Sequence, residues 1–258
     1  MSTLTAPIPV DIAGVNTRPG LGRLVAVELR KMVNTRAGFW LQIAMVAITV
    51  VVVAARSVTG DAADHTFASV LGLGLQPAAV LLPIVGILLV TSEWSQRTGM
   101  ITFALVPVRS RILGAKLIAS IVLSLAMLVM SVAVVAAGVF VAAPGAGAWT
   151  DAGTLIAQSA VFLTTGIITG LAFGAILLAS APAIVALFAL PITWTAVATL
   201  SVFADAAPWL DTRLALAPLH EEVMSATQWA HAGTALAIWM LLPLLIGTWR
   251  ITRREIAA

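Results

Sequence analysis

The sequence predicts an all-α integral membrane protein with six transmembrane helices. Of its 258 residues, 60% are hydrophobic and only 10% are charged, whereas a soluble domain carries about 25% charged residues to cover its surface. Six apolar stretches approach or exceed the length of about 20 residues that a helix needs to cross the hydrocarbon core. Backbone groups in lipid must be paired within each segment, and no stretch alternates like a barrel strand, so these segments are expected to be helices.

The predicted spans divide the chain into a short cytoplasmic segment, a transmembrane domain and a tail. The spans cover residues 38–55, 67–92, 115–143, 153–180, 182–204 and 233–249. Residues 1–37 precede the transmembrane domain, which extends over 38–250, and residues 251–258 form the tail. No composition shift marks off a separate soluble domain.

The distribution of lysine and arginine predicts the orientation in the membrane. Twelve of the fourteen fall on one side of the predicted topology: Arg18, Arg23, Arg30, Lys31, Arg36, Arg97, Arg109, Arg111, Lys116, Arg250, Arg253 and Arg254. Only Arg56 and Arg213 fall on the other side. The positive-inside rule then places both termini and the loop between the second and third spans in the cytoplasm of a multi-pass cell-membrane protein. The net charge of +3 reflects this topology and not a nucleic-acid partner.

Residues 21–34, just before the first span, have the pattern of an amphipathic helix lying at the cytoplasmic interface. Its apolar face holds Leu21, Leu24, Val25, Leu29 and Met32. Glu28 projects from the middle of that face, where a carboxylate is costly unless it is paired. Two interpretations stay open: Glu28 pairs with a basic residue of the cytoplasmic loop, Arg109 or Arg111 being the candidates, or the helix tilts and Glu28 reaches water.

The cytoplasmic loop at 93–116 is the second informative stretch. It carries several charges, and Pro107 can end a short amphipathic helix over residues 99–106. An ordinary positive-inside loop would have the same composition.

This stretch resembles the motif that follows the second span in type-2 ABC exporter permeases. The similar residues are Glu93, Arg97-Thr98-Gly99, Leu105-Val106-Pro107-Val108-Arg109-Ser110-Arg111 and Lys116. Glu28-Leu29-Arg30-Lys31 and Arg36 also resemble that family's N-terminal interfacial helix. The resemblance extends over the whole chain, through its six spans and cytoplasmic ends. Met100-Ile101 departs from the Thr-Leu that many members have there.

The resemblance implies that the stretch after the second span is a coupling helix that docks on a separate ATPase. The residues expected to form or brace that contact are Glu93, Arg97, Thr98, Gly99, Pro107, Arg109 and Arg111. ATP and Mg are expected only in the partner, because neither lysine of this chain, Lys31 or Lys116, lies in a phosphate-binding Gly-Lys-Ser/Thr motif. Six spans are half of a pathway in that family. We therefore expect two ATPase copies and a second permease chain, identical or related, and no enzymatic activity in this chain.

The segment at 205–232 is polar and external in the predicted topology. Pro218 can begin a short helix with Glu221 and Glu222 near its positive end, and Trp209 and Trp229 can anchor it at the interface. The resemblance implies re-entrant helices that gate the exit, and a solvated loop is the alternative.

Intramembrane amides and small residues are the remaining signals inside the spans. Gln42, Gln76 and Gln158 either line a substrate path or make interhelical hydrogen bonds. Gly166, Gly170 and Gly174 repeat at four-residue spacing, which favours close packing within the chain over a dimer seam.

Two other classes compete with an exporter. An intramembrane hydrolase would need a metalloprotease His-Glu-x-x-His pattern, a membrane-facing Glu pair with basic partners, or a serine with a histidine in a span; His65, His220 and His231 fit none of these. A sensor or scaffold would share the topology without needing the coupling motif. An apolar pathway without buried charges suits an amphipathic, lipid-like or drug-like cargo.

Overall fold

The computed structural model describes residues 20–59, 65–95, 109–142, 145 and 147–253. Across these ranges the regular structure is helical, and six helices are long and apolar enough to cross a membrane. They are Arg36–Val58, Phe67–Trp94, Ser110–Val141, Ala152–Leu177, Ser180–Ala198 and Ala226–Arg253. The predicted all-helical class is confirmed for these residues, and so is the prediction of six helices with the length and hydrophobicity of a span.

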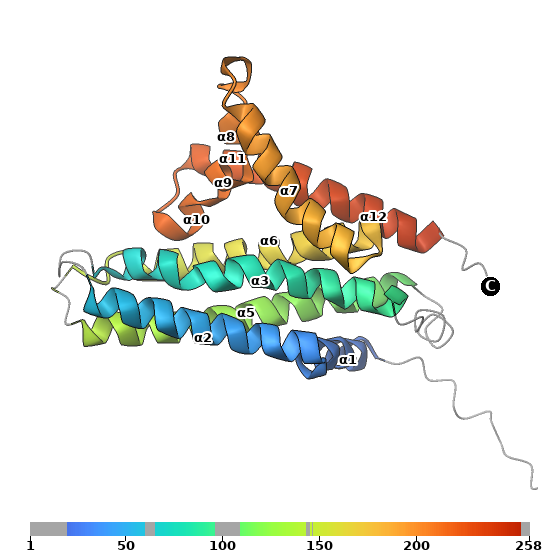
Figure 1. Cartoon of the computed structure of the whole chain (residues 1–258), viewed down its shortest axis with the longest axis horizontal. Coiled ribbons are helices and arrows are strands. Elements are labelled where there is room, and N and C mark those ends of the chain that lie inside the picture. Colours follow the sequence, from blue (N-terminus) through green and yellow to red (C-terminus); the bar gives the residue numbers. More distant parts are fainter. Residues whose placement is uncertain (1–19, 60–64, 96–108, 143–144, 146, 254–258) are drawn as a thin grey trace, which may run out of the picture.

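Five helices lie side by side in a bundle that holds most of the core (Figure 1). They are α1 (Leu21–Asn34), α2 (Arg36–Val58), α3 (Phe67–Ser95), α5 (Arg109–Val141) and α6 (Ala152–Leu177). α3 contacts all four of the others and is the central element of the bundle. The start of α1 and the end of the last span lie at the same end of the structure, as an even number of spans requires.

The packing of α3 on α6 depends on glycine. A Cβ atom at Gly170 would overlap the backbone carbonyl of Pro83, and one at Gly174 would lie 3.1 Å from the Ile87 backbone. On the opposite helix, a Cβ at Gly86 would overlap the carbonyl of Ile167. Gly170 and Gly174 of the α6 repeat therefore pack within the chain, as expected, because the two backbones approach too closely there for a larger residue.

α7 (Ser180–Ala198) and the first half of the last span diverge from the bundle. α7 crosses α6 obliquely, and the final span is built from α11 (Ala226–Leu236), η4 (Ala237–Leu241) and α12 (Leu242–Arg253) (Figure 1). η4 is a turn of π-helix just before Pro243, whose missing N–H cannot complete the α-helical hydrogen-bond pattern. α12 packs against α6, where Gly247 lies close to Ala175.

The segment between the fifth and sixth spans, which the sequence predicts to be external and which we call the external segment, differs from the prediction in its boundaries. The fifth span ends at Ala198 and not near residue 204, and the sixth begins at Ala226, so that Trp229 belongs to a span. Between them lie four short helices: η3 (Ser201–Phe203), α8 (Ala207–Leu210), α9 (Thr212–Leu216) and α10 (Pro218–Glu221). α10 packs against α6 and α3.

Candidate functional site

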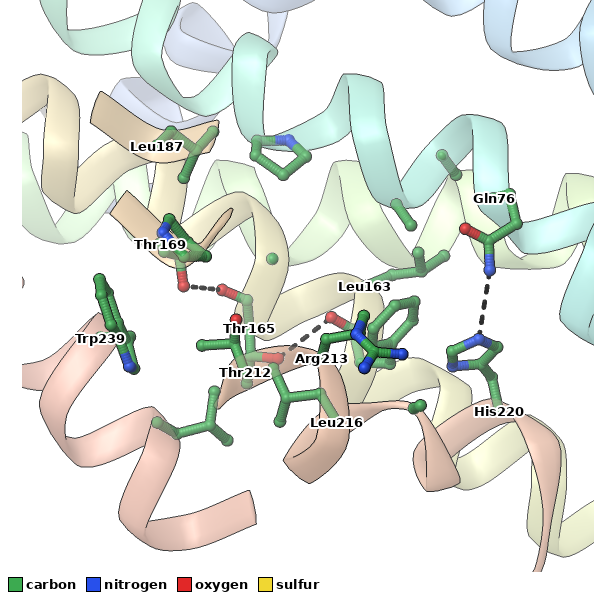
Figure 2. A pocket seen from close by; sticks show the side chains of 18 of the residues that line it. Gln76, Leu163, Thr165, Thr169, Leu187, Thr212, Arg213, Leu216, His220 and Trp239 are labelled. Carbon is green, nitrogen blue, oxygen red and sulfur yellow. Dashed lines mark hydrogen bonds between the residues drawn. The ribbon is translucent and has the colours of Figure 1, made fainter. Parts of the chain in front are cut away.

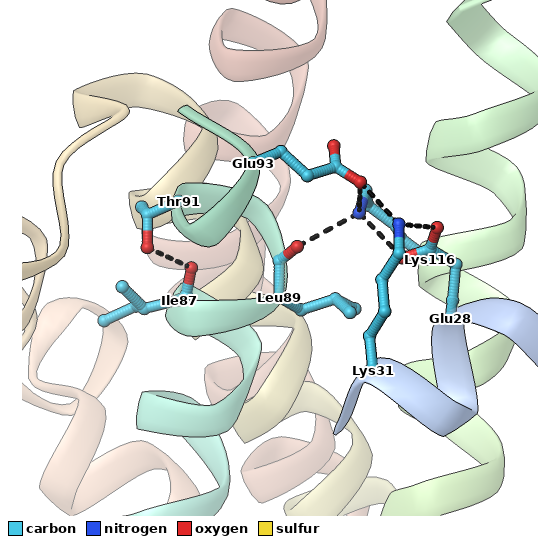
Figure 3. Close-up of polar contacts among 7 residues, drawn as sticks. All are labelled: Glu28, Lys31, Ile87, Leu89, Thr91, Glu93 and Lys116. Carbon is cyan, nitrogen blue, oxygen red and sulfur yellow. Dashed lines mark hydrogen bonds and ion pairs between the residues drawn. The ribbon is translucent and has the colours of Figure 1, made fainter. Parts of the chain in front are cut away.

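Two groups of polar residues stand out in the apolar bundle, one at an end of it and one beside the middle of its spans. The first is a cluster of four charged side chains, Glu28, Lys31, Glu93 and Lys116, which we call the charge cluster (Figure 3). The second group lines a cavity between α3, α6, α7 and the short helices α9 and α10 (Figure 2). We call it the cavity.

The charge cluster joins three helices. Glu28 and Lys31 lie one turn apart on α1, Glu93 lies near the end of α3, and Lys116 lies near the beginning of α5. Lys116 Nζ lies 2.7 Å from Glu28 Oε2 and 2.9 Å from Glu93 Oε1, and Lys31 Nζ lies 2.8 Å from Glu28 Oε1 and 2.7 Å from Glu93 Oε1. Each ammonium therefore bridges the same two carboxylates.

Lys116 is fully satisfied within the protein. Besides the two carboxylates, its Nζ donates to the backbone carbonyl of Leu89 at 3.0 Å, which uses all three donors of an ammonium group. Its side chain is only 2% exposed, and those of Glu28 and Glu93 are 5% and 7% exposed. Two cations and two anions compensate one another, so this buried cluster carries no net charge.

Lys31 forms the outer side of the cluster. Burial by itself would lower the pKa of Lys31, but hydrogen bonds to Glu28 and Glu93 and the negative charges of both residues outweigh that effect. The pKa of Lys31 therefore lies above its ordinary value of 10.5, and the ammonium stays charged at neutral pH.

The expected pairing of Glu28 is confirmed, but with other partners than those named from the sequence. Arg109 and Arg111 were the candidates, whereas the partners in the structure are Lys31 and Lys116. Lys116 lies on the face of α5 that packs against α1 and α3, whereas Arg111 is partly exposed. The alternative in which Glu28 reaches water is wrong, because Glu28 is buried.

The expected coupling residues fall partly inside and partly outside the described residues. Arg97, Thr98, Gly99 and Pro107, and with them the predicted coupling helix at 99–106, lie outside the described residues. Of the remainder, Glu93 ends in the charge cluster, and Arg109 begins α5. Arg30 and Arg36 of the predicted interfacial helix are exposed. Glu93 and Lys116, the first and last residues of the predicted cytoplasmic loop at 93–116, thus both belong to the charge cluster.

The cavity has a volume of about 530 Å³, within the range of about 300–1,000 Å³ typical of sites for small molecules. Gln76 and His220 lie at one end of it and Trp239 at the other (Figure 2). Phe162, Phe173 and Phe188 supply aromatic wall, and the His220 ring stacks on Phe162 with ring centres 4.4 Å apart.

Hydrogen bonds hold the external helices over the cavity. The Gln158 side chain donates to the Glu222 carbonyl at 2.7 Å and accepts from the Met224 N–H at 3.0 Å. The buried Asp211 carboxylate accepts from the N–H groups of Arg213 and Leu214, which caps α9. Trp239 Nε1 donates to the Leu210 carbonyl at 2.8 Å and so ties the last span to α8.

His220 is a buried titratable group on α10. Burial lowers the pKa of His220 below its ordinary value of 6.5, and the negative charge of Glu221 only partly offsets this. The imidazole is therefore neutral at pH 7. Its Nε2 lies 3.3 Å from Gln76 Nε2, whereas Nδ1 is buried without a hydrogen-bond partner in the described part of the chain.

The three intramembrane glutamines have different environments. Gln76 lines the cavity. Gln42 donates to the carbonyls of Met32 and Gly38, where it ties the end of α1 to α2, and Gln158 anchors the external segment. Interhelical and loop hydrogen bonding, one of the two interpretations from the sequence, thus describes Gln42 and Gln158.

The expected gate residues are spread over the external region. Glu221 lines the cavity, and Glu222 accepts a hydrogen bond from Gln228 Nε2 at 2.6 Å. Trp209 packs edge to face against His231, and Trp229 is exposed on α11. The sequence did not single out His220, Arg213 or Trp239 as site residues; only the placement of α9 and α10 beside the spans reveals them.

The sequence matches no protein-family model and no curated protein. Among the described residues, no group of three or more His, Asp or Glu is arranged to hold a metal ion. One end of the bundle is held together by the charge cluster, and a cavity suited to a small molecule lies beside the middle of the spans.

Proposed function

We propose that this chain is the membrane-spanning permease subunit of an ATP-driven exporter of the type-2 ABC class. In this proposal a separate ATPase, in two copies, hydrolyses ATP, and two permease chains form the pathway. Both termini and the 93–116 segment face the cytoplasm of the cell membrane, and the cargo is amphipathic.

The charge cluster is the observation that carries the proposal. Glu93 and Lys116 flank the segment expected to contact the ATPase, and they form an ion pair with each other. Each also pairs with a residue of α1: Glu93 with Lys31, and Lys116 with Glu28. Because these ion pairs are buried, they are screened far less by salt than surface pairs. A force applied to the segment would move α1, α3 and α5 as one unit.

The arrangement of the spans supports the same mechanism. α3 and α6 are held together by backbone contact at Gly86 and Gly170, so they would move as a rigid pair. α7 and the α11 part of the last span diverge from that pair, and Trp239 ties the last span to α8. Closure of the ATPases would tilt the bundle against these two helices and open the external side, an equilibrium between two packed states.

Co-expression with an ABC-type ATPase subunit from the same genome tests the proposal. We expect the two chains to co-purify and ATP hydrolysis to rise when the permease is present. Replacing Arg109 and Arg111 together with Glu should abolish the stimulation while the permease remains folded. Arg253→Glu is the matched control, because Arg253 lies at the same end of the structure but contacts Trp249 on its own helix.

Two results would contradict the proposal. One is stimulation of the ATPase that the Arg109→Glu, Arg111→Glu double variant leaves unchanged. The other is a stable complex with a membrane-bound kinase and none with an ATPase, which would favour a sensor.

A further inference from the structure

The walls of the cavity are mostly apolar and come from a single chain. Phe162 and Phe173 belong to α6, Phe188 to α7 and Trp239 to the last span. Aromatic side chains of this kind bury the apolar part of a ligand at low entropic cost. The cavity therefore needs no second protomer to form its walls.

One end of the cavity offers hydrogen-bond donors. The Gln76 amide nitrogen donates to the Gly72 carbonyl at 3.3 Å and lies 3.3 Å from His220 Nε2. With that nitrogen as donor, Nε2 of the neutral His220 ring is the acceptor, and Nδ1 carries the proton. Buried polar atoms are normally paired, and Nδ1 has no hydrogen-bond partner among the described residues. Because Nδ1 is itself buried, a ligand oxygen can accept from it only after the ring turns toward the cavity.

The charge at the rim selects among ligands. Arg213 lines the cavity on α9, and no ion pair to its guanidinium occurs among the described residues. Glu221 also lines the cavity, but its side chain is 62% exposed and approaches only the His220 ring, at 3.9 Å. Arg213 is also exposed at this rim, and its guanidinium fork can bind a carboxylate or phosphate through two hydrogen bonds.

We propose that the cavity binds an anionic amphiphile: its apolar chain or ring system lies against the aromatic walls, and its carboxylate or phosphate head lies between Arg213, Gln76 and His220. The site is complete within one chain and does not require the dimer. This deepens the proposed export function, on which it rests for the role of the bound molecule as cargo. Binding itself requires no ATPase.

Equilibrium binding of radiolabelled oleate to the purified chain in phosphatidylcholine nanodiscs tests the site, with oleyl alcohol as the uncharged probe. Arg213→Gln should weaken oleate binding by about tenfold, the loss expected for a charged hydrogen-bonded pair, and leave oleyl alcohol unaffected. Arg56→Gln is the matched control, because Arg56 is the other arginine on the predicted external side and lies away from the cavity.

Two further variants test the apolar wall of the cavity and its charged rim separately. Ala79→Phe places a ring into the cavity wall and should abolish binding of both probes. Glu221→Gln removes the opposing charge and should strengthen oleate binding. Because Arg213 and Glu221 are exposed, their variants keep the test valid if Ala79→Phe fails to fold.

The source of the anion is distinguished by adding phosphatidylglycerol to the nanodiscs. Competition with oleate that depends on Arg213 identifies a bilayer lipid as an occupant, and its absence identifies a free amphiphile; both support an anionic site. Equal oleate affinity in the wild type, Arg213→Gln and Arg56→Gln would overturn the inference. That result would have no bearing on co-purification with the ATPase, so either proposal can be wrong while the other holds.

Discussion

Lys116 and Glu28 are separated by 88 residues in the sequence, yet Lys116 Nζ lies 2.7 Å from Glu28 Oε2 in the interior of the protein. The pair joins the helix that precedes the first span to the third span. Together with Glu93 and Lys31 it forms a neutral cluster in which each cation serves both anions. Removing one member would leave the others buried and unbalanced.

Lys116→Met should therefore destabilise the protein strongly. Breaking a buried ion pair by removing one partner typically costs about 3–5 kcal/mol, because the remaining charge stays in a poorly solvated site. The thermal unfolding midpoint in detergent is the measurement. Lys31→Met is the matched control: Lys31 contacts the same carboxylates but is 34% exposed, so its loss should be smaller. Equal losses in the two variants would contradict the proposed difference in burial.

Gly170→Ala should disrupt the packing of α3 on α6. The added Cβ would overlap the Pro83 carbonyl, and because that atom belongs to the backbone, only a shift of the whole helix could relieve the clash. Overpacking of this kind costs about 1–3 kcal/mol or more.

Gly166→Ala provides the comparison on the same face of the same helix. Its Cβ would lie 3.7 Å from the Pro83 ring, an ordinary contact, and alanine favours a helix over glycine by about 1 kcal/mol. We expect the unfolding midpoint of Gly166→Ala to match or exceed that of the wild type. A parallel loss in both variants would show that α3 and α6 pack differently.

Stability should decrease at acidic pH through His220. Burial holds the pKa of His220 below 6.5 in the folded state, so the unfolded chain takes up a proton at a higher pH than the folded chain does. The free energy of unfolding is then unaffected well above pH 6.5 and falls as the pH drops through that value, levelling off below the folded pKa.

Hydrogen exchange at α10 and unfolding midpoints between pH 8 and 5 would measure this effect. His220→Asn should remove much of the decline, whereas His231→Asn, which alters a histidine packed against Trp209, should keep it. Identical pH profiles for the wild type and His220→Asn would contradict the assignment.

Single-cysteine labelling should establish the orientation, since the chain contains no cysteine of its own. Four exposed residues are suitable for replacement by cysteine, one at a time. Ser110 and Arg253 lie at one end of the structure, and Thr150 and Thr227 lie toward the other. A membrane-impermeant maleimide should label the second pair in intact cells and the first pair only after permeabilisation. The reverse pattern would exclude a cytoplasmic 93–116 segment.

The sequence by itself determined the membrane class, the number of spans and the limits of the amphipathic helix at Leu21–Asn34. These properties depend on local hydrophobicity and helical periodicity, which a single segment carries without its neighbours. The glycine repeat at Gly166, Gly170 and Gly174 likewise indicated close packing from spacing alone.

The tertiary structure decided which distant residues meet. The sequence predicted that Glu28 needs a cation, but the choice of Lys116 over the nearby arginines depends on the rotation of α5 about its own axis. Gln76 and His220 are 144 residues apart and meet only because α10 folds back onto α3 and α6. Hydrophobicity fixes how deep each helix lies in a membrane; the packing of side chains against neighbouring helices fixes which face it turns inward, and no segment contains that information alone.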